Sequence, residues 1–311
     1  MKVYYKPEHV EKRKKTIITI GTFDGVHLGH QKILDEVVKR AKEIGGRSLV
    51  ITFDPHPRFV VSPDYDLELL TTTDEKLTIL ETTAIDNVLV INFTKEFSQM
   101  SYENFIKKII CDEIGVQHIV VGYDHKFGKD RGGDKSKLLG MSDECDFTVS
   151  GADEVKIDGE VISSTKIRKA LKTGDLEKAN KYLGRNYSFS GKVIRGAQRG
   201  RELGYPTANI KPEAHKVIPA NGVYFVKVFL RDEVYFGLMN IGTRPTFEHL
   251  NHPIIETYIF GLNKNIYTKL VKTEVIKKIR NEVKFVTKEA LIRQIEKDIE
   301  IAEELIDKYQ N

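Results

Sequence analysis

The hydrophobic pattern of this chain changes its period part of the way along, and that change limits the folds it can adopt. From Thr16 to about Phe147, short β-rich runs alternate with stretches whose apolar residues recur at helical spacing. Beyond residue 184, apolar and polar residues alternate in short segments separated by Gly, Pro and Asn. The first pattern is typical of a parallel sheet covered by helices, and the second of antiparallel strands. Two domains of different class are therefore expected, at 1–184 and 185–311.

The N-terminal half should be an α/β domain. Between its first two strand-like runs, Ile33, Leu34 and Val37 recur at helical spacing, and a second such pattern follows Ser101, which can cap a helix. Further short helices are expected at 167–171 and 176–183. The predicted strands are 16–20, 48–53, 88–93, 118–122 and 146–149.

The C-terminal half should be a small antiparallel barrel or sandwich with a helix packed on it. Its predicted strands are 188–194, 223–230, 234–241, 254–260 and 270–276. The segment 200–209 is too polar, and too rich in Gly and Pro, to be predicted as a strand, and it is interpreted as a ligand loop. After Thr287 an amphipathic helix is expected. Its apolar face would comprise Leu291, Ile292, Ile295, Ile299, Ala302, Leu305 and Ile306.

The amino-acid composition limits the kinds of partner that this chain is expected to bind. The 49 Lys and Arg and 45 Asp and Glu residues give a net charge of +4, a balanced surface that argues against nucleic acid. No run of about 18 apolar residues could span a bilayer, and the charged N-terminus is unlike a signal peptide. Cys111 and Cys145 have no metal-site spacing. We expect a cytoplasmic protein that does not bind a membrane, as a monomer or weak homo-oligomer.

The segment 21–30, GTFDGVHLGH, directly follows a predicted strand and leads into a predicted helix. Its glycines allow close approach of a ligand, and a helix start favours an anion. His27 and His30 are three residues apart, so both can reach a phosphate on the first helical turn. The alternatives are two histidines with purely structural hydrogen bonds, or a zinc site, for which no third ligand at a familiar spacing is visible.

A second segment of interest, 162–168 (ISSTKIR), again precedes a helix. Its hydroxyl groups can cap that helix, while Lys166 and Arg168 extend from the first turn toward an anion. Taken alone, it could equally be an ordinary cap with two solvated charges.

Together, the HxGH form of His27 to His30 and the ISSTKIR segment resemble the nucleotidylyltransferase superfamily. More closely, the order GTFDGVHLGHQ, FDPHP (53–57), GYDHKFGKDRGG (122–133) and ISSTKIR resembles bacterial FAD synthetase. The resemblance implies a Rossmann-like domain in which the phosphate of FMN attacks the α-phosphate of ATP and pyrophosphate leaves. Such a site must supply alignment and positive charge rather than a nucleophile.

By this resemblance, His27, His30 and Arg168 would act on the phosphates as catalytic residues. ATP binding is implied for Gly21, Phe23, Asp24, Gly29, Ser164 and Thr165. Flavin binding is implied for Asp124, Phe127, Arg131 and His56.

In the C-terminal half, Thr207 and Asn209 offer neutral oxygens at alternate positions, a set suited to Mg²⁺ on nucleotide phosphates, and Gly204 allows close backbone approach. A turn with local hydrogen bonds would explain the same residues. Glu256 lies within a predicted strand among apolar neighbours. It could face solvent on an edge strand, or point into a site and remove a proton from a hydroxyl group.

The order GYPTAN, MNIGTRPTF (239–247), the Glu256 strand and IRNEVKF (279–285) resembles riboflavin kinase. That family is a six-stranded antiparallel barrel with a C-terminal helix. The resemblance implies that Thr207 and Asn209 bind Mg²⁺ and ATP, with Gly204 also at the ATP. It further implies that Glu256 activates the terminal ribityl hydroxyl and that Arg280 positions the flavin. This chain has Thr268 where the family usually has Gly, which affects expected kinase efficiency more than identity.

Both resemblances occur in the order found in the bacterial bifunctional riboflavin kinase and FMN adenylyltransferase family. We therefore expect a chain that binds riboflavin, FMN, FAD and ATP and uses Mg²⁺. One alternative is a monofunctional FAD synthetase whose barrel only binds flavin. Another is a flavin-sensing protein that binds nucleotide, or RNA, without turnover; the balanced charge argues against it.

Overall fold

The structure is a computed structural model that describes residues 1–311 except 123–126, 130–131, 197–199, 201–202, 244–252 and 311. The chain divides into two units, Met1–Ser164 and Thr165–Asn311. Each is described by itself below.

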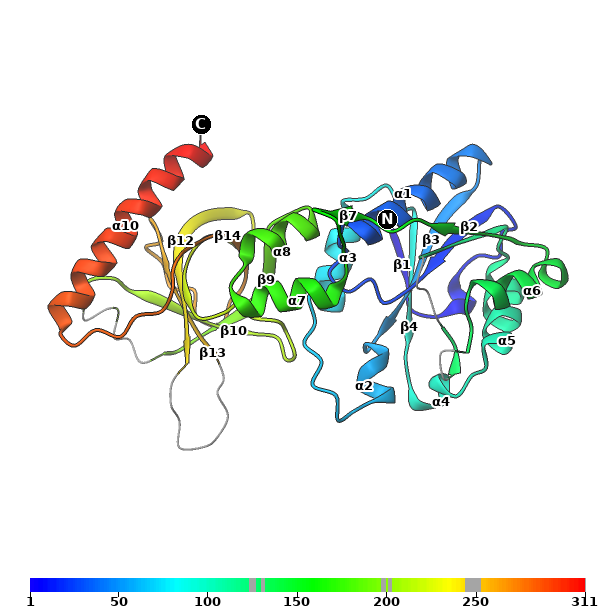
Figure 1. The fold of residues 1–311 in the computed structure, drawn as a ribbon, viewed down its shortest axis with the longest axis horizontal. Coiled ribbons are helices and arrows are strands. Elements are labelled where there is room, and N and C mark those ends of the chain that lie inside the picture. The colour runs from blue at the N-terminus through cyan, green and yellow to red at the C-terminus, as the bar shows by residue number, and fades with distance from the viewer. Residues whose placement is uncertain (123–126, 130–131, 197–199, 201–202, 244–252, 311) are drawn as a thin grey trace. The chain divides into compact units, whose positions relative to one another are not determined.

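The first unit contains a six-stranded sheet whose strands all run parallel, in the order β1-β4-β3-β2-β5-β6 (Figure 1). The strands are β1 (Lys2–Tyr4), β2 (Thr16–Ile20), β3 (Arg47–Asp54), β4 (Asn87–Asn92), β5 (His118–Gly122) and β6 (Thr148–Ala152). The α/β prediction is confirmed. Sequence analysis missed β1, and it started the last strand two residues early because the αL residue Asp146 still ends the preceding helix.

Helices cover both faces of this sheet. Ile17 packs with Leu34 and Val37 of α1 on one face, whereas Ile18 and Ile20 pack with the π-helical segment η2 on the other, as the alternation of a strand requires. The helical segments are η1 (Pro7–His9), α1 (Leu28–Glu43), α2 (Pro57–Val61), α3 (Thr73–Glu81), α4 (Lys95–Ser98), α5 (Tyr102–Asn104), η2 (Phe105–Ile114) and α6 (Lys135–Cys145). A small hairpin of β7 (Lys156–Ile157) and β8 (Glu160–Val161) precedes the end of the unit.

The second unit is a closed antiparallel barrel in the order β10-β13-β12-β11-β14-β9, as predicted. Its strands are β9 (Tyr187–Ile194), β10 (Thr207–Pro212), β11 (Gly222–Leu230), β12 (Glu233–Thr243), β13 (Pro253–Ile259) and β14 (Leu270–Arg280). The prediction that 207–209 belong to a loop is wrong. The strand accommodates its polar residues because β9 and β13 supply backbone hydrogen-bond partners on both sides.

Among the described residues, the helices that belong with the barrel are α7 (Ser164–Thr173), α8 (Leu176–Leu183) and α10 (Lys288–Gln310). From Thr165 onward α7 belongs to the second unit, and the backbone N–H of Ala220 donates to the Leu171 carbonyl at 2.9 Å. As predicted, α10 lies along the outside of the barrel (Figure 1), where Ala302 and Leu305 are buried against Phe225 and Leu238. Burying one such leucine contributes about 2 kcal/mol.

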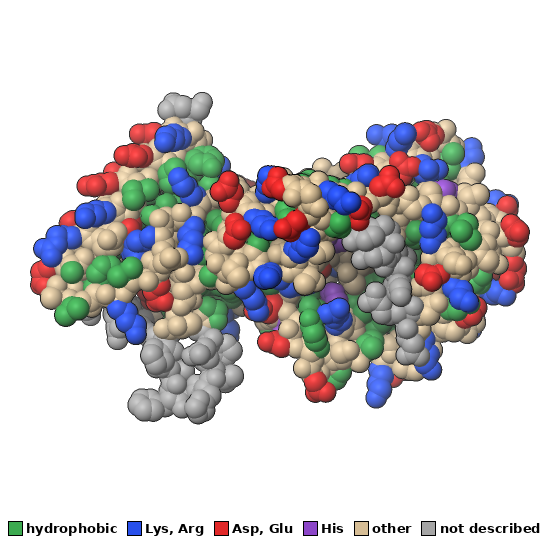
Figure 2. Space-filling view, viewed as in Figure 1, with side chains coloured by type: hydrophobic (Ala, Val, Ile, Leu, Met, Phe, Trp, Pro, Cys, Tyr) green, Lys and Arg blue, Asp and Glu red, His purple; other side chains and the backbone are tan. Residues whose placement is uncertain are grey.

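Charges of both signs are interspersed over the face of the molecule drawn in Figure 2. Among the described residues, no helix is both long and apolar enough to cross a membrane.

Candidate active sites

The first candidate site is the loop between β2 and α1. His27 is the N-cap of α1, and its Nδ1 accepts a hydrogen bond from the backbone N–H of His30 at 3.3 Å. The two rings stack with their centroids 3.6 Å apart. A Cβ atom at Gly29 would lie 3.1 Å from the His27 ring, so glycine leaves room for this cap. The two histidines predicted from the HxGH motif are thus brought together at a helix N-terminus, where an anion is favoured.

The backbone of this loop is held in an uncommon conformation. Phe23 and Val26 have φ values of 48° and 37°, which residues other than glycine rarely adopt. Asp24 is buried, and its carboxylate accepts hydrogen bonds from the N–H groups of Leu70 and Thr71 at 3.1 and 2.9 Å. The Thr71 hydroxyl accepts from the Gly25 N–H at 2.9 Å. The predicted ATP-binding residue Asp24 therefore fastens the loop to the segment before α3.

The predicted residues of the ISSTKIR segment fall in both units. Ser164 closes the first unit, and its hydroxyl donates to the Asp24 carbonyl at 2.9 Å, which places it beside the loop. Thr165 and Arg168 belong to the second unit. On α7, Thr165 is exposed, whereas Arg168 is half-buried next to the buried Ile167.

The predicted flavin-binding residues of the first unit are spread over several environments. His56 caps α2, and its Nδ1 accepts from the Arg58 N–H at 3.2 Å. The Phe127 ring is 8% exposed and packs against Phe105 with centroids 6.1 Å apart, within the core. Asp124 and Arg131 lie outside the described residues.

The second candidate site is a row of polar residues across three neighbouring barrel strands. Asn209 of β10 pairs with Glu256 of β13, which in turn pairs with Asn240 of β12. Directly paired residues have their side chains on the same face of a sheet. Ile255 and Thr257, on either side of Glu256, are buried inside the barrel, so the row lies on the outer surface. Because β13 is paired on both sides, the prediction that Glu256 could lie on an edge strand is wrong.

Two glycines bring a neighbouring segment close to this row. A Cβ atom at Gly196 would clash with the side-chain amide of Asn209, and one at Gly200 would lie 3.1 Å from the Thr207 hydroxyl. Gly204 has a φ of 88°, in the left-handed region that favours glycine. The backbone therefore approaches the predicted ligands closely, as a phosphate-binding loop requires.

The donor atoms of this site fit a hard cation. Thr207 and Asn209 alternate on β10 and so share one face, with the Glu256 carboxylate in register beside Asn209. Neutral and carboxylate oxygens suit Mg²⁺, which is usually held by a few protein oxygens together with water and substrate phosphates. In the described part of the chain, no three His, Cys, Asp or Glu side chains gather in a metal-binding group.

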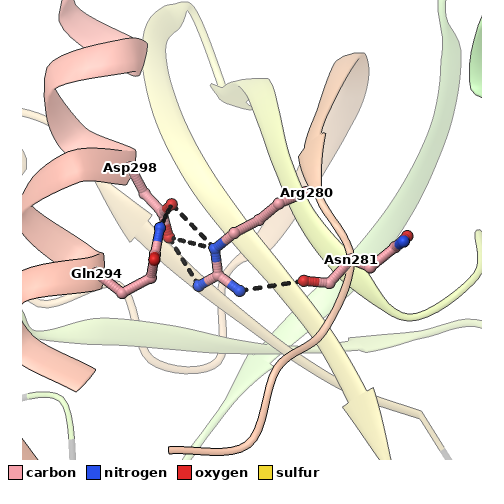
Figure 3. Close-up of polar contacts among 4 residues, drawn as sticks. All are labelled: Arg280, Asn281, Gln294 and Asp298. Carbon is pink, nitrogen blue, oxygen red and sulfur yellow. Dashed lines mark hydrogen bonds and ion pairs between the residues drawn. The ribbon is translucent and has the colours of Figure 1, made fainter. Parts of the chain in front are cut away.

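Arg280, predicted to position the flavin, is held by the C-terminal helix (Figure 3). Its Nη2 and Nε donate to the Asp298 carboxylate at 2.8 and 3.0 Å, and Gln294 donates to the same carboxylate at 2.9 Å. The third guanidinium nitrogen donates to the Asn281 carbonyl at 3.1 Å. Asp298 is 3% exposed and Arg280 is half-buried, so this ion pair between β14 and α10 is partly shielded from solvent.

Sequence reasoning missed several residues of both sites. Asn240 could have been found from the alternation of β12, because it stands two residues after Leu238 on the same face. Thr71 and Lys76 belong to no recognisable motif. The only signal near them is the helix start between Thr72 and Glu75, which form a capping box. The contribution of Thr71 and Lys76 depends on contacts with residues about 50 positions away.

Comparison with known proteins gives a consistent result for both units. A family model described as FAD synthetase matches residues 9–166, and one described as riboflavin kinase matches residues 183–306. A bifunctional riboflavin kinase/FMN adenylyltransferase of Buchnera aphidicola is 39% identical over 94% of each chain. The protein of the same description from Bacillus subtilis is 38% identical over 94% of this chain and 93% of its own.

Among solved structures, one described as a macrolide-efflux protein from Streptococcus pneumoniae has a TM-score of 0.87 and 27% identity. It covers 97% of this chain and 98% of its own. The fold of that protein is thus similar along the whole chain, whereas its efflux description agrees with neither family model.

Proposed function

Because this chain belongs to the family of bifunctional riboflavin kinases/FMN adenylyltransferases, we propose that the two sites described above carry its two activities. The chain phosphorylates riboflavin to FMN with ATP, and adenylylates FMN with a second ATP to give FAD and pyrophosphate. The barrel performs the first reaction and the α/β unit the second. The riboflavin kinase match begins at residue 183, which supports 184/185 as the functional boundary.

In the barrel, Glu256 takes the proton of the terminal ribityl hydroxyl as its oxygen attacks the γ-phosphorus of ATP, and ADP leaves. The observation that carries this assignment is the register of Asn209, Glu256 and Asn240, which places an acid beside neutral oxygen ligands. Thr207 and Asn209 would hold Mg²⁺, which supplies positive charge to the phosphates. Gly204 lets the backbone approach ATP, and Arg280 acts on the flavin through the segment that follows it.

In the α/β unit, the FMN phosphate attacks the α-phosphorus of ATP, so the protein has to align two anions and offset their charge. His27 and His30 at the start of α1 bind the ATP phosphates, with Gly21, Phe23 and Gly29 forming the loop around them. The remaining assignments comprise Asp24, Ser164, Thr165 and Arg168 for ATP and His56, Asp124, Phe127 and Arg131 for the flavin. A cytoplasmic location and a monomeric or weakly associated state remain predictions.

The first experiment separates riboflavin, FMN and FAD by chromatography after incubation of the purified protein with riboflavin, ATP and Mg²⁺. FMN followed by FAD is expected. FAD formed from supplied FMN, with riboflavin unchanged, would support the monofunctional alternative. If neither flavin is converted, the proposal is wrong.

Two variants test the division of labour, and each is the control for the other. Glu256→Gln should lower riboflavin phosphorylation by about 10²- to 10⁴-fold and leave FMN adenylylation unchanged. His30→Ala should lower FAD formation by about 10²- to 10³-fold and spare FMN formation. Equal loss of both activities in either variant would contradict the two-site assignment.

A further inference from the structure

A lysine is buried beneath the loop that we assign to ATP. Lys76 of α3 is 5% exposed, and its Nζ donates to the Thr22 carbonyl at 2.9 Å and to the Thr52 hydroxyl at 3.0 Å. Thr52, in turn, donates to the same Thr22 carbonyl at 3.2 Å. Burying an ammonium group costs several kcal/mol unless nearby groups compensate, so such a residue needs an explanation.

The element that carries this lysine supports the loop at two places. The segment before α3 supplies Thr71, which bonds to Asp24 and Gly25, and one turn into the helix Lys76 bonds to Thr22. The capping box of Thr72 and Glu75 fixes the start of the helix between these two contacts. The Thr22 carbonyl and the Asp24 carboxylate are therefore held from the same rigid element.

The loop needs this support because its own conformation is unfavourable. Phe23 and Val26 lie in the left-handed region, at a cost of about 1–2 kcal/mol each. Lys76 holds the residue immediately before Phe23, and Thr71 holds the residue immediately before Val26. Without these contacts, the loop would relax away from the geometry that stacks His27 on His30.

Burial of Lys76 lowers its pKa, whereas two nearby carboxylates raise it. Asp24 from the loop and Asp54 from the end of β3 favour the charged form of Lys76. The larger effect is burial, which lowers the pKa of Lys76 from its ordinary value to about 8. Lys76 is thus mainly cationic below about pH 8 and mainly neutral above it.

We propose that Lys76 is a positioning residue for adenylyl transfer, which fixes the Thr22 carbonyl and holds a positive charge beneath the phosphate-binding loop. The inference rests on the function proposed for that loop. Its consequence is that FAD formation falls as the pH rises through about 8, because the neutral amine no longer holds the carbonyl or the two carboxylates by charge. Riboflavin phosphorylation, performed by the other unit, should not share this pH dependence.

The test measures the rate of FAD formation from FMN and ATP between pH 6 and 10, with riboflavin phosphorylation by the same samples as the control for folding. Lys76→Met keeps the length of the side chain and removes the charge. We expect it to lower kcat for FAD formation by about tenfold to a hundredfold, with a smaller change in KM for ATP. The alkaline fall in rate near pH 8 should disappear. Lys39→Met, at an exposed position of α1, should behave like the unchanged protein.

A second variant keeps the proposal testable if Lys76→Met fails to fold. Thr52→Val removes one hydrogen-bond acceptor from Nζ, which should disfavour the ammonium and shift the alkaline fall to lower pH. FAD formation that is unaltered in Lys76→Met, or an alkaline fall that persists there, would overturn the inference while leaving the proposed function intact. An unshifted fall in Thr52→Val would also overturn it. If the unchanged protein forms no FAD, the proposed function fails and this inference fails with it.

Discussion

The two sites to which we assign ATP are built in different ways. In the α/β unit, the histidines depend on a loop that is held by distant buried groups, Asp24 and Lys76 among them. In the barrel, Asn209, Glu256 and Asn240 stand side by side because three strands pair in one register. Loop geometry depends on each tertiary contact, whereas register is secured by many backbone hydrogen bonds at once.

The difference predicts where each site is vulnerable. Each unit has one of these buried carboxylates: Asp24 fastens the loop between β2 and α1, and Asp298 fastens α10 to Arg280. Losing the first should disturb the chemistry directly, because the loop itself carries the site. Loss of Asp298 should lower the stability of the barrel more than it disturbs the row of Asn209, Glu256 and Asn240. The register of that row does not depend on α10.

Of the Asp24, Asp298 and Thr268 variants, Asp24→Ala should lower enzymatic activity most. It tests whether the site of the α/β unit depends on buried support. The variant leaves the N–H groups of Leu70 and Thr71 without their acceptor, at a cost of about 3 kcal/mol in the free energy of unfolding. FAD formation should fall by about a hundredfold, measured alongside FMN formation, which should not change. Asp35→Ala, at an exposed position of α1, is the matched control. Near-normal FAD formation would mean that the loop holds itself.

Asp298→Ala should have a smaller effect on chemistry and a clear effect on stability. The half-buried Arg280 guanidinium loses its partner, which lowers the free energy of unfolding of the barrel by about 2–3 kcal/mol in chemical denaturation. At temperatures where the variant is folded, KM for riboflavin should rise and kcat should stay within several-fold. Replacing both partners, Arg280→Met with Asp298→Leu, should recover much of the stability, and Glu303→Ala on an exposed part of α10 is the control. A collapse of kcat in the folded variant would show that the catalytic row depends on α10 after all.

The smallest effect concerns the turn before β14, where this chain has threonine. Thr268 has a φ of 67°, so its turn keeps a conformation that favours glycine, with its N–H still bonded to the Val193 carbonyl at 2.8 Å. Thr268→Gly should raise the melting temperature, because it raises the free energy of unfolding by about 1 kcal/mol. The rate of riboflavin phosphorylation should change by less than about twofold. Lys269→Gly should destabilise instead, because Lys269 is not among the described residues with positive φ. A gain in kcat for Thr268→Gly would mean that the turn limits catalysis.

Much of this molecule could be predicted from sequence because the signals were local. The periodicity of buried residues gave most strands of the sheet and of the barrel and the long C-terminal helix, and the short spacing of His27 and His30 was enough to place them together. The strand status of 207–212 could not be predicted, because its polar residues are accommodated by partners on β9 and β13 that lie far away in the sequence. The contact of the Phe127 ring with Phe105 could not be predicted either, because the two rings come from different segments of the chain that only the fold brings together.

The sequence by itself determined the class of each unit, their order, and the residue types that we assign to phosphate binding, because hydrophobic period and short motifs are properties of neighbouring residues. Only the tertiary structure decided which groups support those residues. Lys76 beneath the loop, Asn240 beside Glu256 and Asp298 against Arg280 are each brought into place by chain segments separated by 16 or more positions. The physical reason is that a buried charge or polar group is stable only where the folded chain supplies its partners.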